Sequence, residues 1–189
     1  MKSKKILLIT IFSFLFLGFS QAVSAAGFID QQQTNYLGGS EEIYYPGHYW
    51  AQSFVPTKST LSQVDLALAK KTSMPYGNFY VEIRTDLNNQ PYDTIASVSR
   101  SAANLPTSMS WVRFNMPYTK LTPGKKYWIF VRYTDGLQSD AIKWGRAASN
   151  LYSNGNGYDF YNDQYKSWDF AFKTYGGVSI QKIIPTPKP

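Results

Sequence analysis

The 189-residue sequence contains no cysteine and only one histidine, His48. Without cysteine no disulfide can form, so a domain built from this chain depends on its hydrophobic core or on a bound ion. A conventional zinc site draws its ligands from cysteine and histidine and is therefore nearly excluded. A Ser-His-Asp arrangement would have to use His48, yet no G-x-S-x-G motif is present. We expect His48 to be a structural or surface residue.

Charged residues are also sparse, at 16% of the chain. Three of the 19 basic residues precede residue 27, which leaves 16 basic and 12 acidic residues and a net charge of +4. These basic residues form no cluster, whereas nucleic-acid binding requires a basic patch or groove. The aromatic segment near the end carries Asp159, Asp163 and Asp169 against one Lys166, which disfavours a polyanion. We predict that nucleic acid is not a partner.

Residues 1–26 have the three parts of a secretory signal peptide. Three lysines precede an apolar run at 6–19, and the small residues of Val23-Ser24-Ala25-Ala26 suit a signal peptidase. The run is short for the ~20 residues that a membrane-spanning helix needs. We predict cleavage after Ala25 or Ala26, no transmembrane segment in the mature chain, and a protein that is secreted or loosely associated with the cell surface. No cysteine follows the cleavage site, so no lipid anchor is expected.

Residues 27–178 predict an all-β domain. Tyrosine, phenylalanine and tryptophan are abundant and favour pleated surfaces, while periodic runs of helix formers are missing. Alternation is clearest at 78–86, where Phe79, Val81 and Ile83 point to one side. Further strands are expected at 49–55, 61–70, 111–116, 126–133, 142–144 and 170–173. Eight to ten short strands separated by turns predict a single jelly-roll-like β-sandwich, followed by a Pro-rich tail at 179–189.

Four motifs in a fixed order carry a resemblance to a known family. They are QSFVP at 52–56, VEIRTD at 81–86, LTPGKKYW at 121–128 and DFAFKTYG at 169–176. Together they resemble the choice-of-anchor R type of domain, a β-rich module of secreted and surface proteins in bacteria and archaea, over nearly all of the mature chain. The resemblance implies a jelly-roll-like β-sandwich and export, and it implies no defined enzymatic activity or catalytic residues. The last residues contain no LPxTG-like motif, so we expect free secretion or non-covalent attachment.

Aromatic residues are the best candidates for binding. One cluster lies at Tyr44, Tyr45, Tyr49 and Trp50, and a later one contains Tyr152, Tyr158, Tyr161, Tyr165 and Trp168. Aromatic rings stack on the apolar faces of sugars while neighbouring amides bind hydroxyls. We predict a ligand site for an extracellular polysaccharide or a cell-envelope component, formed by Tyr158, Tyr161, Tyr165, Trp168 and Asn162. The alternative is that both clusters only cover the edges of the sandwich. Trp128 and Trp144 are expected in the core.

Carboxylates leave two further options open. Asp159, Asp163 and Asp169 offer oxygen ligands to calcium as a cofactor, although loops also use aspartate to form turns. Glycoside hydrolysis needs a pair of carboxylates. Glu82 and Asp65 could meet, but each is expected to be a solvated strand residue.

The adjacent Glu41 and Glu42 would point apart if their segment is extended. Because the sequence shows no catalytic triad motif and no favoured carboxylate pair, we predict a non-catalytic binding or surface-associated module. A small glycan hydrolase and a structural surface-layer or matrix protein are the alternatives.

Overall fold

The computed structural model describes residues 27–72, 75–135 and 138–177. The predicted signal peptide and the predicted Pro-rich tail lie outside these residues. The strands and 3-10 helices of the described part are β1 (Phe28–Gln33), β2 (Ser40–Ile43), β3 (Trp50–Phe54), β4 (Thr60–Lys70), β5 (Asn78–Leu87), β6 (Gln90–Ser101), η1 (Ala102–Asn104), β7 (Ser110–Lys120), β8 (Tyr127–Tyr133), η2 (Gln138–Asp140), β9 (Ile142–Gly145), β10 (Gly157–Asp159), β11 (Gln164–Tyr165) and β12 (Phe172–Gly176).

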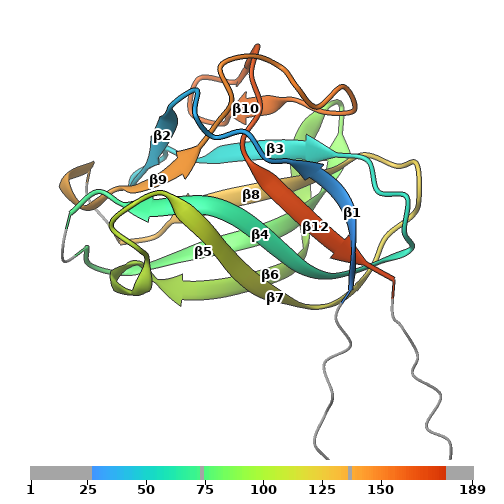
Figure 1. Ribbon diagram of the computed structural model, residues 1–189, viewed down its shortest axis with the longest axis horizontal. Coiled ribbons are helices and arrows are strands. Elements are labelled where there is room, and N and C mark those ends of the chain that lie inside the picture. The colour runs from blue at the N-terminus through green and yellow to red at the C-terminus, as the bar shows by residue number, and fades with distance from the viewer. Residues whose placement is uncertain (1–26, 73–74, 136–137, 178–189) are drawn as a thin grey trace, which may run out of the picture.

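The strands build two six-stranded antiparallel sheets, which confirms the predicted all-β sandwich (Figure 1). The β4 sheet has the order β1-β12-β4-β9-β2, with β7 paired to β4, and the β8 sheet has the order β11-β10-β3-β8-β5-β6. Phe28 of β1 lies opposite Gly176 of β12, so the chain enters and leaves the domain side by side. In the described part of the chain, no helix is long and apolar enough to span a membrane.

The main core lies between the two sheets, where sequence alternation predicts it. The inward side chains Phe79, Val81 and Ile83 of β5 are fully buried. Trp144 is buried against Phe170, with ring centroids 4.2 Å apart, as expected for a core residue. Trp128 is also fully buried, but it belongs to a second, smaller cluster that contains Ala51, Phe130 and Tyr158. The sandwich therefore has apolar packing outside its main core as well.

This second cluster lies on the outer side of the β8 sheet. Trp128 and Phe130 point away from the main core, and the β10–β11 hairpin covers them. The ring of Tyr158 lies 5.6 Å from that of Trp128, and the ring of Tyr165 lies 6.4 Å from it. The Tyr165 hydroxyl donates a hydrogen bond to the Asn89 carbonyl at the β5–β6 turn. The β8 sheet thus curls back so that its edge partly covers its own outer face.

Asparagine and proline at residues 86–91 predict a connection between strands, but the β5–β6 hairpin extends into this segment from both sides. Only Asn88 and Asn89 form the turn, with φ angles of 54° and 64°. Two consecutive residues with positive φ are the mark of the type I′ turn, whose twist matches that of the flanking strands. Pro123 and Gly124 predict a tight turn at residues 121–124, and the structure confirms it, with a φ of 79° at Gly124.

Candidate functional site

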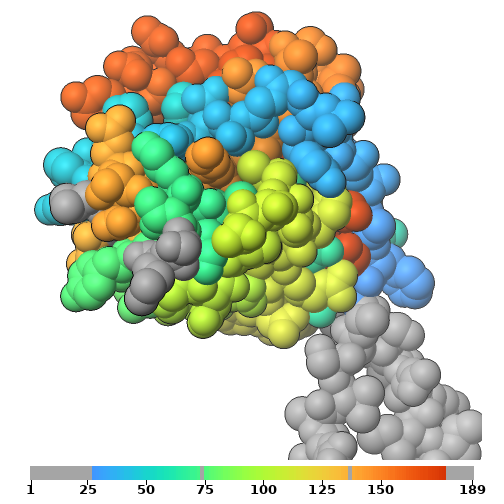
Figure 2. Space-filling view, turned by 60° about the vertical axis from the view of Figure 1, so that its left-hand side comes forward, coloured from blue at the N-terminus to red at the C-terminus, as the bar shows by residue number. Residues whose placement is uncertain are grey.

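The two aromatic clusters, more than 90 residues apart in the chain, meet in the folded protein. The Tyr44 and His48 rings are stacked with centroids 4.3 Å apart, and Tyr161 stacks on His48 at 4.7 Å. Figure 2 shows the orange surface of the late segment against the light-blue surface of the early one. We call Tyr44, His48 and Tyr161 the ring stack. Its outer member, Tyr161, is 61% exposed.

Backbone contacts hold both sides of the ring stack. In the β2–β3 connection, the Tyr44 amide donates a hydrogen bond to the His48 carbonyl at 3.2 Å. Gly47 has a φ of +89°, and a Cβ there would lie 3.3 Å from Tyr161 Cδ2. On the other side, the Asp159 carboxylate accepts hydrogen bonds from the Tyr161 and Asn162 amides, each at 3.2 Å. Glycine thus meets both the conformational and the steric requirement at position 47.

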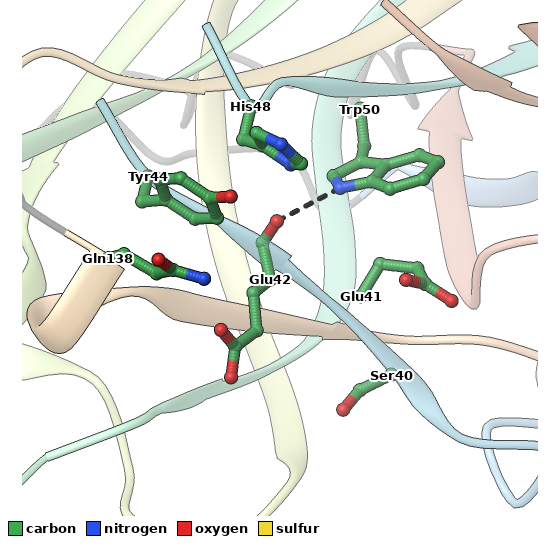
Figure 3. A pocket seen from close by; sticks show the side chains of 7 residues that line it. All are labelled: Ser40, Glu41, Glu42, Tyr44, His48, Trp50 and Gln138. Atoms are coloured by element: carbon green, nitrogen blue, oxygen red, sulfur yellow. Dashed lines mark hydrogen bonds between the residues drawn. The ribbon is translucent and has the colours of Figure 1, made fainter. Parts of the chain in front are cut away.

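A pocket of about 380 Å³ adjoins the ring stack at the edge of the sandwich (Figure 3). It is lined by Ser40, Glu41, Glu42, Tyr44, His48, Trp50 and Gln138. The Trp50 indole donates to the Glu42 carbonyl at 3.0 Å. Glu41 pairs with Arg146 at 2.6 Å and Glu42 pairs with Lys71 at 2.8 Å, so each carboxylate has a cationic partner. The pocket combines aromatic surface with neutralised acids and an amide, a lining that suits a hydroxyl-rich ligand.

The other predicted ligand residues divide into exposed and supporting ones. Tyr165 is half exposed, and Asn162 is exposed, with its amide nitrogen bonded to Asp159 at 2.8 Å. The side chain of Tyr158 in β10 is buried against Trp128, and its hydroxyl donates a hydrogen bond to Asp163. Trp168 is partly buried and packs 4.8 Å from Phe170, centroid to centroid. In this fold Tyr161 and Tyr165 expose ring surface to solvent, and Tyr158 packs against Tyr165 with ring centroids 5.3 Å apart. Trp168 instead packs toward the core, beside Trp50 and Phe170.

Members of the two clusters also pack into the body of the sandwich. Trp50 and Tyr152 are buried in the main core. Tyr49 packs against Phe130 on the outer side of the β8 sheet at 6.0 Å, whereas Tyr45 is about half exposed. The sequence left open that both clusters only cover the edges of the sandwich, but Trp50 and Tyr152 pack into its main core instead.

The three candidate calcium ligands each accept hydrogen bonds from the protein. Asp169 is fully buried and accepts from the Leu151 and Tyr152 amides at 2.7 and 2.8 Å, and burial raises its pKa. Asp163 accepts from Gln90 at 2.7 Å. Burial alone would raise the pKa of Asp159, but hydrogen bonds from Asn162 and Lys166 stabilise the carboxylate more strongly, so its pKa is lowered.

Among residues 27–72, 75–135 and 138–177, no three acidic or histidine side chains form a group that could hold a metal ion. Calcium binding therefore stays a prediction. A cation at Asp159, Asp163 or Asp169 would have to replace the hydrogen bonds that these carboxylates now accept.

The expectation that Asp65 and Glu82 are solvated is wrong, and the two do not form a pair. Both are buried, and they lie on outer faces of different sheets because their strand neighbours, such as Val64 and Val81, point into the core between the sheets. Each carboxylate is instead held by arginine, which sequence reasoning missed. Glu82 and Arg84 are two residues apart on one strand, so a shared face was the available signal.

The comparisons with known proteins give no family for the chain. No protein-family model matches the sequence, and no curated protein matches it.

Proposed function

We propose that the protein is a secreted, non-catalytic module that binds an extracellular polysaccharide through the ring stack and the adjoining pocket. The main support is the position of the Tyr161 ring, which is 61% exposed and stacks on His48 with centroids 4.7 Å apart. A ring fixed before binding loses little conformational freedom when a sugar stacks on it. The resemblance to the choice-of-anchor R type of domain supports export.

The polar groups around the ring stack support the same class of ligand. Asn162 is exposed beside Tyr161, and Gln138 and Glu42 line the pocket. Amides and carboxylates bind sugar hydroxyls while a ring covers the apolar face of the sugar. Hydrolysis is less favoured because Asp65 and Glu82 lie on different outer faces, and because Glu41 and Glu42 are each paired with a cation.

The test is retention on insoluble cellulose, chitin, xylan and peptidoglycan. Tyr161→Ala should weaken binding about fivefold or more, since an aromatic stacking contact is worth ~1 kcal/mol. Tyr118→Ala is the matched control, because Tyr118 is 63% exposed but lies on β7 of the β4 sheet. It should bind as the wild type does.

Unchanged binding by a folded Tyr161→Ala variant would reject the site. Retention of the wild type on none of the polymers would favour a matrix protein instead. Release of reducing sugar from any of them would favour the hydrolase.

A further inference from the structure

A group of charged side chains lies on the outer face of the β8 sheet, beyond the part that the hairpin covers. The buried Glu82 carboxylate accepts from Arg132 Nε at 2.6 Å and from Arg84 Nε and Nη2 at 2.8 and 2.6 Å. Thr94 of β6 donates a further hydrogen bond to it at 3.1 Å. Two guanidinium groups therefore share a single carboxylate, and the group carries one positive charge in excess.

The excess charge lies at Arg132. Only its Nε bonds to Glu82, and its Nη atoms donate no hydrogen bond to any residue in the described part of the chain. The Arg132 side chain is 31% exposed, and its guanidinium lies 4.2 Å from the centroid of the Tyr80 ring. Glu82 on one side and Tyr80 on the other hold this guanidinium plane in place. Two parallel N–H groups at a fixed orientation match the geometry of a carboxylate or phosphate.

The arginines adjoin the aromatic surface of the candidate site. The Arg84 guanidinium lies 3.7 Å from the centroid of the Phe130 ring. Phe130 in turn contacts Phe160 edge-on at 5.2 Å, and Phe160 is the chain neighbour of Tyr161. Arg132 follows Phe130 by two residues on β8 and so lies on the same face of the sheet. A polymer that stacks on Tyr161 can therefore continue over Phe160 and Phe130 toward Arg132. Beyond the arginines, the exposed Ser97 pairs with Glu82 across the sheet and offers a hydroxyl.

We infer that the polysaccharide is acidic and that Arg132, held by Glu82 and Tyr80, binds its carboxylate or phosphate groups. This inference rests on the proposed function. On the sequence alone, the aspartates of the late aromatic segment argue against a polyanionic ligand. Their positions in the structure weaken that argument. Asp159 and Asp169 are buried and accept hydrogen bonds from the protein. Asp163 is exposed but accepts hydrogen bonds from Gln90 and Tyr158, and the arginines come from β5 and β8 instead.

The test measures affinity electrophoresis of the full chain in gels that contain polygalacturonate, highly methyl-esterified pectin or poly(glycerol phosphate). The first two polymers differ in charge on the same sugar backbone, and the third separates phosphate from carboxylate. Wild type should be retarded most by one of the two anionic polymers, and salt should weaken that retardation. Arg132→Gln should lose about tenfold in affinity for that polymer, because a charge-assisted, bidentate contact is lost.

Three further variants make the result specific. Arg132→Lys keeps the charge without the fork and should bind the anionic polymer more weakly than wild type, which decides the matter if Arg132→Gln does not fold. Arg113→Gln removes the same charge from the outer face of the β4 sheet and should leave binding unchanged. Tyr161→Ala should weaken binding to anionic and esterified polymers alike.

Equal retardation by pectin and polygalacturonate with no effect of either Arg132 variant would overturn the acidic ligand. In that result, a loss of binding by Tyr161→Ala would still support the proposed function. Equal losses in Arg113→Gln and Arg132→Gln would reduce the effect to net charge and would also overturn it. If none of the three polymers retards the wild type, the inference is rejected. It is also rejected if single-stranded DNA retards the protein and these polymers do not.

Discussion

The two outer faces of the sandwich each hold a buried carboxylate on a central strand, but they hold it differently. On the β4 sheet, Arg113 donates to both Asp65 oxygens, at 2.9 and 3.0 Å, and Tyr175 adds a bond at 2.7 Å. On the β8 sheet, Arg84 and Arg132 share Glu82. The first arrangement is a closed one-to-one pair, whereas the second leaves one guanidinium only partly used.

Exposure alone would lead to the wrong arginine. The Arg113 side chain is 54% exposed and that of Arg132 is 31% exposed. The hydrogen bonds separate them, because Arg113 uses both Nε and Nη2 on Asp65 and Tyr175. Arg132 uses only Nε on Glu82, so among the described residues both of its Nη groups remain available. A surface arginine therefore offers binding capacity according to the hydrogen-bond donors that it has left, and not according to the area that it exposes.

Removal of the acid should have the larger effect on the β8 sheet. Glu82→Gln leaves two adjacent guanidinium groups without a counter-charge and should lower the free energy of unfolding by about 3 kcal/mol. Asp65→Asn leaves one arginine, which is more exposed, and should cost about 1–3 kcal/mol. Urea titrations of the two variants and the wild type measure both values. A Glu82→Gln cost equal to or below that of Asp65→Asn would remove the contrast between the faces.

The sequence alone predicts a solvated Glu82, and removal of a solvated carboxylate would not be expected to cost this much stability. Alternation along 78–86 correctly predicts that Ile83 is buried and that Glu82 faces the other way. It does not show that the outer side is packed too, because Arg84 and Arg132 cover Glu82 through a cross-strand register that only the fold provides. The same limit applies to the ring stack, since Tyr44 and Tyr161 meet through tertiary packing.

Strands without regular alternation were also missed. β6 lies at the edge of its sheet and is largely exposed on both sides, so its residues follow no apolar period. The short β10 and β11 lie in a segment rich in glycine and asparagine, which is typical of loops. The strands β4, β5 and β7 were predictable because burial of one face in the main core imposes the two-residue period on them. β8 was predictable as a run that is apolar on both faces, and the structure buries it on both.

Lowering the pH should reduce the free energy of unfolding by less than the Glu82→Gln substitution does, and it should act on the buried carboxylates of both faces. Burial raises the pKa of Glu82 and of Asp65, but hydrogen bonds from the arginines outweigh burial, so both pKa values are lowered. Their stabilisation is present above the ordinary values of 4.5 and 3.8 and is lost as pH falls toward the lowered values. Glu82→Gln should therefore flatten the loss of stability between about pH 5 and pH 3 in urea titrations. A slope identical to that of the wild type would contradict the ionised, arginine-held state of Glu82.

Hydroxyl-radical footprinting shows directly whether polysaccharide binds at the ring stack. Tyr161 and Tyr118 have matched exposures of 61% and 63% but lie on different parts of the sandwich, so each serves as the reference for the other. Oxidation of both residues should be measured by mass spectrometry with and without polygalacturonate. If polysaccharide binds at the ring stack, the polymer should slow oxidation of Tyr161 and leave that of Tyr118 unchanged. Protection of Tyr118, or an unprotected Tyr161 in a sample that binds the polymer, would contradict it.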